Sequence, residues 1–317
     1  MKTEASIQSD GLDAGFSLVM PVLKRKLSDS DPAELPQVES VENAASCEVK
    51  VGDCLSVLKE TPDQVFQCCV TSPPYWGLRD YGIAGQIGAE KTVGDYITNL
   101  VNVFREVRRT LRDDGTLWLN IGDSFTSGNR TWRDSDKKNP ARGMTYRPPT
   151  PEGLKPKDLI GVPWKLAFAL QDDGWYLRSD IVWNKPNAQP ESVKDRPTRS
   201  HEFIFLMSKR EDYYYDHQSV MEIGVDKKPR NRRSVWAINT EPSKEAHFAM
   251  FPPKLVELCI EAGSPKDATV LDPFFGAGTV GVVATTLGRN CVGIELKDEF
   301  AAIAERRLRA VHPSLQL

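Results

Sequence analysis

Apolar and polar residues along this chain form two patterns that alternate, one typical of buried strands and one typical of amphipathic helices. Phe66–Thr71 is a short continuous run of apolar and small residues, which is typical of a strand buried on both faces. Between residues 92 and 111, apolar side chains recur every three or four positions, as at Val93, Tyr96 and Leu100. That spacing predicts an amphipathic helix, which follows the strand in the chain.

The same two patterns assign the other elements. Strands are expected at Cys47–Val51, Thr116–Ile121, Leu177–Trp183, Glu202–Met207, Thr269–Leu271 and Cys291–Glu295. Helices are expected at Cys54–Lys59, Thr92–Leu111, Lys165–Leu170, Pro252–Ala262, Thr279–Leu287 and Glu299–Val311. Because strands alternate with helices, the pattern predicts an α/β fold whose mostly parallel sheet is covered by helices on both faces.

Two long segments, 124–158 and 209–245, interrupt this alternation. Both are basic, although the whole chain carries a formal net charge of -3. Loops longer than about 12 to 15 residues in a compact domain are usually functional or disordered. Since Lys and Arg that bind phosphates supply affinity for nucleic acid, the two segments are candidate DNA-contacting inserts. The residues expected to make those contacts are Arg130, Lys137, Lys138, Arg142, Lys227, Lys228, Arg230, Arg232 and Arg233. The competing interpretation is a pair of solvated charged loops.

Composition limits the class of protein. With 317 residues, 40% hydrophobic and 27% charged, the chain is an ordinary globular sequence. Residues 1–44 are polar and acidic and are expected to form a flexible tail, followed by a single domain over residues 45–317. The sequence contains neither a run of about 18 apolar residues nor a secretory signal. Its six cysteines include no C-x-x-C pair, so no metal site is expected. The low number of cysteines favours a cytoplasmic protein whose cysteines are reduced.

A glycine-rich loop follows one of the last predicted strands. Asp272-Pro-Phe-Phe-Gly276-Ala-Gly278 leads into a helix, and Glu295 ends the next strand, 17 residues after Gly278. Such glycines let a nucleotide approach the backbone, and the acidic residue can accept hydrogen bonds from ribose hydroxyls. Gly276-x-Gly278-x-x-Gly281 also matches a nicotinamide fingerprint, but Asp272 would repel a pyrophosphate and suits a ligand with a cationic end. A purely structural glycine turn is the third possibility.

A second motif, Thr71-Ser72-Pro73-Pro74-Tyr75-Trp76, lies at the end of a predicted buried strand. The two prolines form a rigid turn that fixes Ser72 and the Pro73 carbonyl as acceptors, with the aromatic face of Tyr75 close by. This arrangement fits a planar ring that carries an amino group. The alternative is a proline turn with an anchoring aromatic side chain.

Together, the two motifs resemble those of the exocyclic-amino DNA methyltransferases, which act on N4 of cytosine or N6 of adenine. The order, with Ser-Pro-Pro-Tyr before Asp-Pro-Phe-Phe-Gly-Ala-Gly, is that of the permuted β-type members, and the resemblance covers about residues 47 to 310. It implies a Rossmann-like S-adenosylmethionine-dependent methyltransferase fold, S-adenosyl-L-methionine as cofactor, and double-stranded DNA whose target base is flipped out of the helix.

The resemblance also implies roles for individual residues. Catalytic roles fall on Ser72, Pro73, Pro74 and Tyr75. Cofactor binding falls on Asp53, Thr71, His247, Phe251, Asp272, Pro273, Phe274, Gly276, Gly278, Thr279 and Glu295. Many adenine-directed members carry Asp or Asn where this chain has Ser72, so the family trend favours N4 of cytosine over N6 of adenine.

Several alternatives stay open at this point. A restriction-modification or orphan enzyme is expected, with a possible cognate endonuclease acting separately and a possible homodimer. Two hypotheses from other classes compete with it. A nicotinamide-dependent oxidoreductase would bind NADH and give Ser72 no role. A non-catalytic nucleic-acid-binding protein would bind DNA without turning over S-adenosylmethionine.

Overall fold

The structure is a computed structural model that describes residues 45–77, 86–126, 150, 153–241 and 251–313. The predicted N-terminal tail lies outside the described residues. The strands are β1 (Cys47–Val51), β2 (Phe66–Thr71), β3 (Leu111–Ile121), β4 (Tyr176–Asn184), β5 (His201–Ser208), β6 (Glu222–Ile223), β7 (Pro229–Arg230), β8 (Val235–Ala237), β9 (Thr269–Asp272) and β10 (Asn290–Glu295). The helices are α1 (Cys54–Glu60), α2 (Val93–Thr110), α3 (Val162–Asp172), α4 (Pro253–Gly263), α5 (Thr279–Thr286) and α6 (Asp298–Val311).

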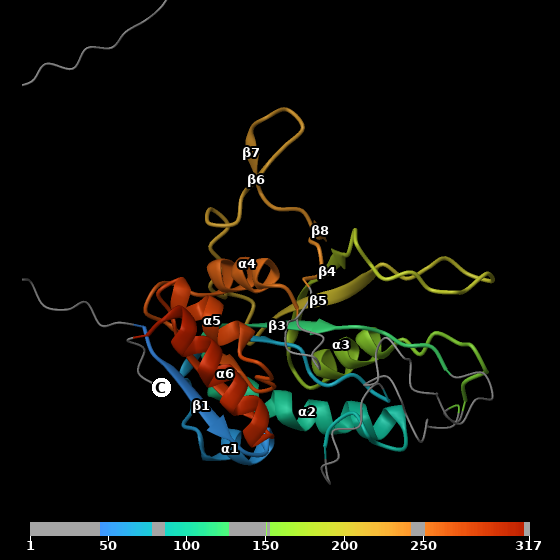
Figure 1. The fold of residues 1–317 in the computed structure, drawn as a ribbon, viewed down its shortest axis with the longest axis horizontal. Coiled ribbons are helices and arrows are strands. Elements are labelled where there is room, and N and C mark those ends of the chain that lie inside the picture. The colour runs from blue at the N-terminus through green and yellow to red at the C-terminus, as the bar shows by residue number, and fades with distance from the viewer. Residues whose placement is uncertain (1–44, 78–85, 127–149, 151–152, 242–250, 314–317) are drawn as a thin grey trace, which may run out of the picture. The chain divides into compact units, whose positions relative to one another are not determined.

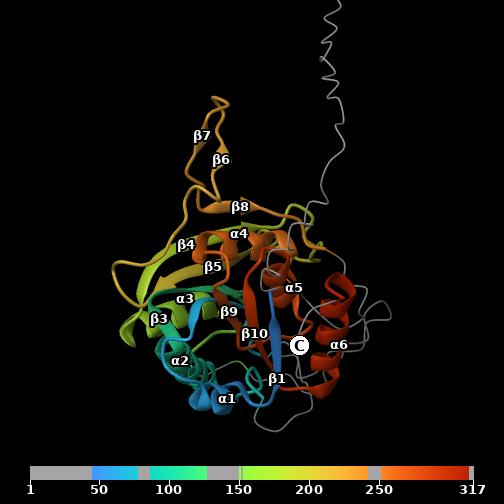
Figure 2. The same cartoon turned by 90° about the vertical axis from the view of Figure 1, so that its left-hand side faces the viewer.

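The described residues form one eight-stranded sheet in the order β1-β10-β9-β2-β3-β5-β4-β8. The first five strands of that order run parallel, β5 is antiparallel to both of its neighbours, and β8 runs parallel to β4. Helices α1, α2 and α3 cover one face and α4, α5 and α6 the other (Figures 1 and 2). The predicted mostly parallel α/β fold is confirmed.

Each central strand sends side chains into two separate cores. Cys69 in β2 packs in the core beneath α1, α2 and α3, while its neighbours Cys68 and Val70 pack in the core beneath α4, α5 and α6. In β3, Leu119 and Trp118 divide between the two cores in the same way. Successive side chains of a strand point to opposite faces, so a strand covered on both faces is apolar on both, as the middle residues of these two strands are.

The strands that come last in the sequence lie inside the sheet. β9 pairs with β2, with Cys68 opposite Val270 and Cys69 opposite Leu271, and β10 joins β9 to β1. The motif after β2 and the glycine-rich loop after β9 are therefore placed at the ends of adjacent parallel strands. This is the permuted order that the sequence predicts.

Boundaries differ from prediction most at β3. The strand begins at Leu111, directly after α2, and not at Thr116, and its register against β2 shifts between Phe66 and Cys68. Gly115 lies within the strand where an added Cβ would be 2.9 Å from the Arg112 carbonyl oxygen. Gly115 thus allows a close approach of backbone atoms inside the strand, whereas the predicted strand starts only after it.

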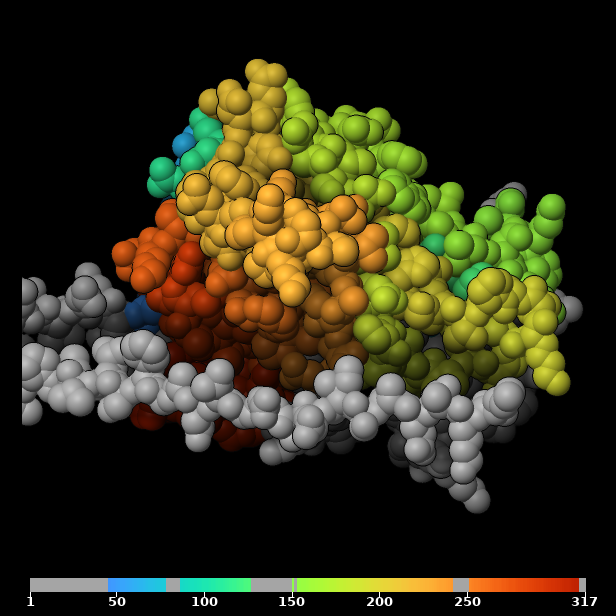
Figure 3. Space-filling model, turned by 90° about the horizontal axis from the view of Figure 1, so that it is seen from above, coloured from blue at the N-terminus to red at the C-terminus, as the bar shows by residue number. Residues whose placement is uncertain are grey.

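The insert 209–245 contains three short strands that the sequence did not predict. β6 and β7 form an antiparallel hairpin that stands clear of the sheet in both ribbon views, and β8 adds an edge strand beside β4 (Figures 1 and 2). Seen from above, the hairpin faces the viewer (Figure 3). An exposed side chain at its turn, Val225, is 95% accessible to solvent.

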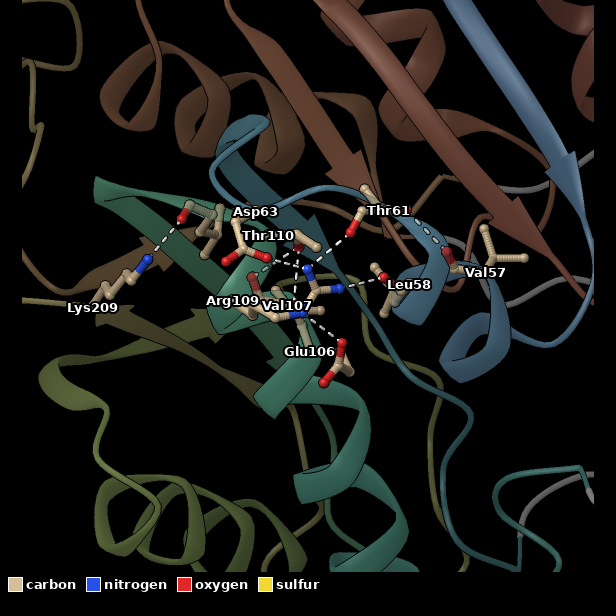
Figure 4. A network of polar contacts seen from close by, with 10 residues as sticks. Val57, Leu58, Thr61, Asp63, Glu106, Val107, Arg109, Thr110 and Lys209 are labelled. Atoms are coloured by element: carbon tan, nitrogen blue, oxygen red, sulfur yellow. Dashed lines mark hydrogen bonds and ion pairs between the residues drawn. The ribbon is translucent and has the colours of Figure 1, made fainter.

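Arg109, near the end of α2, ties α1 to α2 (Figure 4). Its guanidinium donates to the carbonyl oxygens of Leu58 at 2.7 Å and Thr61 at 2.9 Å. It also pairs with the carboxylates of Asp63 and Glu106. The last carbonyls of a helix have no partner within the helix, so these bonds close the end of α1 and fix it beside α2.

Candidate active site

The ends of β2 and β9 meet through one short hydrogen bond. The Thr71 hydroxyl donates to Asp272 Oδ1 over 2.6 Å, and the backbone N–H of Phe274 donates to the same oxygen over 3.1 Å. Both Thr71 and Asp272 are buried. Ligands of open α/β sheets bind at the carboxyl ends of the strands, so the two predicted motifs face one candidate site.

Asp272 is a buried acid next to another acid. Burial raises its pKa to about 7; the hydrogen bonds from Thr71 and Phe274 lower it and the charge of Glu295 raises it further. Burial also raises the pKa of Glu295, which the backbone N–H groups of Lys297 and Gly276 lower in part. A cationic ligand placed near these carboxyls would relieve the electrostatic cost that raises both pKa values.

The two predicted glycines of the loop have different surroundings. Gly276 has φ of 53° and donates its N–H to Glu295 Oε2 at 2.8 Å; the nearest atom to an added Cβ is 4.0 Å away, which leaves room for a ligand. Gly278 has φ of 77°, and an added Cβ would lie 2.8 Å from the Cβ of Ala304 in α6. Gly276 is thus placed to admit a ligand, while Gly278 is required for packing.

Three of the other predicted cofactor residues lie in this loop or directly after it. Pro273 is buried and Phe274 is half-buried, with its ring edge-on to Phe104 at 6.4 Å. Thr279 is buried at the start of α5, where its hydroxyl accepts a 3.4 Å hydrogen bond from Arg307. Phe251 packs against the core beneath α4. His247 lies outside the described residues.

Asp53 follows β1, whose end is tied to β10 by the N–H of Gly52, which donates to the Glu295 carbonyl at 2.9 Å. The Asp53 carboxylate accepts from the backbone N–H and the hydroxyl of Ser56, at 2.9 and 2.8 Å. It therefore caps the N-terminus of α1. The structure places Asp53 at the same sheet edge as Glu295 and gives it this structural contact.

The Ser-Pro-Pro-Tyr turn is held from several sides. Tyr96 in α2 donates its hydroxyl to the Pro74 carbonyl at 2.8 Å, and the Tyr75 ring packs so closely on Gly122 that an added Cβ there would be 2.7 Å from Tyr75 Cε2. The Tyr75 hydroxyl donates to Glu202 Oε2 at 2.8 Å. This turn is thus a preorganised surface beside Asp272.

Three residues at this turn were given no site role from the sequence. Asn120 donates to the Tyr75 oxygen at 3.1 Å and to Glu202 Oε2 at 3.0 Å, and Lys185 forms an ion pair with Glu202 Oε1. They lie within the range of about residues 47 to 310 over which the sequence resembles the methyltransferase family, and nothing else in the sequence pointed to them. Their convergence depends on β3, β4 and β5 being neighbours in the sheet.

A cavity of about 50 Å³ adjoins Tyr75; its walls are Tyr75, Trp76, Gly122, Asp123, Ser124 and Val162. The Asp123 carboxylate accepts from the backbone N–H groups of Ser124 at 2.9 Å, Gly161 at 2.9 Å and Val162 at 3.0 Å. Arg199 lies 3.7 Å from the other carboxylate oxygen. Asp123 thus anchors the start of α3 and shapes the wall of the cavity.

The basic residues of the hairpin segment divide into two groups. Arg230 pairs with Glu222 at 2.8 Å, and Arg232 lies 3.9 Å from the same carboxylate, so part of their charge is neutralised within the insert. Lys227, Lys228 and Arg233 are exposed. The other predicted DNA-contacting residues, Arg130, Lys137, Lys138 and Arg142, lie outside the described residues.

Among the described residues, no three acidic, His or Cys side chains are grouped so that they could hold a metal ion. In the same part of the chain, no helix is both long and apolar enough to cross a membrane.

Comparison with known proteins gave consistent matches. A family model for N6- and N4-directed DNA methylases matches residues 66–306. The type II methyltransferase M.SmaI of Serratia marcescens is 64% identical over 268 residues, which cover 84% of this chain and 92% of M.SmaI. M.Cfr9I of Citrobacter freundii is 58% identical, with 91% and 93% of the two chains covered.

Solved structures share the fold at lower identity. The PvuII DNA methyltransferase (cytosine-N4-specific) has a TM-score of 0.63 at 21% identity, over 83% of this chain and 86% of that one. A putative DNA modification methylase of Thermus thermophilus, TTHA0409, complexed with S-adenosyl-L-methionine, has a TM-score of 0.59 at 23% identity, with coverage of 84% and 95%.

Proposed function

The chain belongs to the family of N6- and N4-directed DNA methylases, and from that premise we propose that it methylates the exocyclic N4 of a cytosine flipped out of double-stranded DNA. That it is a DNA methyltransferase follows from the family. The choice of atom is the proposal. The methyl-transfer site rests on the hydrogen bond between Thr71 and Asp272, which joins the end of the Ser-Pro-Pro-Tyr strand to the start of the glycine-rich loop. The choice of N4 rests on Ser72, the first residue of the motif.

The residues at the ends of β9 and β10 fit S-adenosylmethionine. Two buried carboxyls with raised pKa values suit a molecule that carries a cationic ammonium and sulfonium, and the space at Gly276 admits it. Asp272 and Phe274 would hold the methionine end, and Glu295 the ribose hydroxyls, with Asp53 near the adenine. When bound, S-adenosylmethionine supplies a methyl group on positively charged sulfur.

The Ser-Pro-Pro-Tyr turn would act on the target amine. An exocyclic amine is a poor nucleophile because its lone pair is delocalised into the base. Ser72 Oγ and the Pro73 carbonyl would each accept one of its hydrogens and favour a tetrahedral nitrogen, while the Tyr75 ring stacks on the base. Fixed acceptors of this kind lower the barrier by positioning and by electrostatic preorganisation.

Two observations favour N4 of cytosine over N6 of adenine. The first residue of the motif is Ser72, where many adenine-directed members carry Asp or Asn. One fold neighbour is described as cytosine-N4-specific. Nucleoside mass spectrometry of unmethylated DNA, incubated with the protein and S-adenosylmethionine, tests the proposal. N4-methylcytosine is the expected product; N6-methyladenine would reverse the assignment of the base.

DNA contact is assigned to the basic inserts. A two-stranded ribbon fits the major groove of B-DNA, and the β6–β7 hairpin is such a ribbon, with exposed cations at Lys227 and Lys228 in its turn and at Arg233 after β7. In the other insert, Arg130, Lys137, Lys138 and Arg142 would contact phosphates. The proposal also includes a restriction-modification role, in which a separate cognate endonuclease acts on the same DNA, and assembly of the protein as a homodimer.

A further inference from the structure

Three side chains contact the phenol oxygen of Tyr75, and a fourth is joined to them through Glu202. Asn120 donates to it at 3.1 Å, the Ser72 hydroxyl hydrogen-bonds to it, and the phenol itself donates to Glu202 Oε2 at 2.8 Å. Lys185 pairs with the other oxygen of Glu202. The connection therefore runs from the catalytic turn to a carboxylate on a different strand.

The hydrogen bonds that link Ser72, Tyr75 and Glu202 in a row all run in one direction, toward Glu202. A phenol oxygen has one hydrogen to donate and can accept others. Since that one hydrogen is donated to Glu202, the Tyr75 oxygen accepts the hydrogen bonds from Asn120 and Ser72. Burial and the charge of Glu202 raise the pKa of Tyr75 well above its usual value, while the bonds from Ser72 and Asn120 lower it in part, so the phenol keeps its proton.

The far end of the row has access to solvent. The side chains of Lys185 and Glu202 are 17% and 18% exposed, although Asn120 is buried. The Lys185 ammonium also lies 4.1 Å from the centre of the Trp183 ring, which fixes it beside the carboxylate. A proton that reaches Glu202 can therefore leave to water without crossing the active site.

On the basis of the proposed function, we infer that Ser72, Tyr75 and Glu202 form a relay that removes the proton which the target amine must lose. As the nitrogen–methyl bond forms and the sulfur–methyl bond breaks, the nitrogen becomes positively charged. Its proton passes to Ser72 Oγ, the Ser72 proton to the Tyr75 oxygen, and the Tyr75 proton to Glu202 Oε2. The products are the neutral methylamino base, S-adenosylhomocysteine and a protonated Glu202, which loses its proton to water.

Tyr75→Phe and Glu202→Gln test the relay. Tyr75→Phe keeps the stacking ring and removes the hydroxyl; Glu202→Gln keeps an acceptor oxygen but cannot take up a proton. General acid–base groups contribute about a hundredfold or more to the rate, so each variant should lower kcat about a hundredfold. The KM for DNA and for S-adenosylmethionine should stay unchanged. The matched control is Glu305→Gln, which removes an exposed carboxylate 3.8 Å from Arg309 on α6.

The double variant distinguishes a relay from a structural role. If Glu202 acts through the Tyr75 hydroxyl, Tyr75→Phe/Glu202→Gln should be no slower than the slower single variant. The relay would be overturned if the losses in kcat of the two single variants multiplied in the double variant. It would also be overturned if the kcat of Glu202→Gln were within about threefold of that of the unaltered enzyme. Thermal unfolding and S-adenosylmethionine binding show whether each variant is folded. If Glu202→Gln is not folded, the kcat and KM of Tyr75→Phe decide whether the relay holds. Absence of methyl transfer by the unaltered protein would overturn the proposed function, and the relay with it.

Discussion

Replacing Asp272 by asparagine should change how the stability of the ligand-free protein depends on pH. Asp272 is 2% exposed and its pKa is raised to about 7, chiefly by burial. Asparagine keeps an oxygen for the hydrogen bonds from Thr71 and Phe274 but cannot ionise. The variant therefore isolates the cost of the buried charge.

The size of the effect follows from linkage. Because the folded protein holds this proton more tightly than the unfolded chain, the group's contribution is fully present below about pH 4 and is lost as pH rises to about 7. A pKa raised from 3.8 to about 7 corresponds to about 4 kcal/mol in all, at about 1.36 kcal/mol per pH unit. Between about pH 5 and pH 8, the free energy of unfolding should fall by about 3 kcal/mol because of Asp272 alone.

Urea denaturation at a series of pH values measures this directly. The free energy of unfolding of the unaltered protein should fall, relative to Asp272→Asn, by about 3 kcal/mol from about pH 5 to pH 8. Asp212→Asn, at an exposed aspartate, is the control and should follow the unaltered protein. Parallel curves for Asp272→Asn and the unaltered protein, within about 0.5 kcal/mol, would show that the carboxyl is not held protonated in the fold.

Three other predictions concern the active site and the hairpin. Ser72→Ala should abolish methyl transfer, seen by nucleoside mass spectrometry, while calorimetry shows S-adenosylmethionine binding largely intact; persistent turnover would contradict the catalytic role. Gly122→Ala should lower the free energy of unfolding by about 1 to 3 kcal/mol and displace the Tyr75 ring, because the new Cβ would be 2.7 Å from it; a variant with unaltered stability and kcat would refute that packing. Lys227→Ala/Lys228→Ala should weaken binding to all DNA sequences and make the slope of log affinity against log salt less steep by about 2, as a salt titration would show; an unchanged slope would exclude these contacts.

Local patterns accounted for the elements and for much of the candidate site. The helix at Val93–Thr110 and the strand at Phe66–Thr71 follow from apolar spacing, since burial on one face or two imposes a period on the sequence. The two motifs were identified because prolines and glycines restrict or permit backbone conformations whatever surrounds them. Ser72 and Asp272 were identified as candidate residues in this way.

Other features had no local signal. The start of β3 at Leu111 depends on its pairing with β2, and β8 is a strand only because β4 offers it an edge. Arg230 resembled its basic neighbours in the sequence, yet Glu222 neutralises part of its charge. The sequence gives the charge of a residue, but which opposite charge it pairs with depends on the folded structure.

The alternation of strands and helices, the order of the two motifs and the residue types that they supply can all be read from the chain alone. The hydrogen bond between Thr71 and Asp272, and the grouping of Asn120, Lys185 and Glu202 at Tyr75, appear only in the folded protein. The difference lies in the range of the interactions. Turn chemistry and apolar periodicity act over a few residues, whereas these contacts join strands that are far apart in the chain and become neighbours only when the sheet forms.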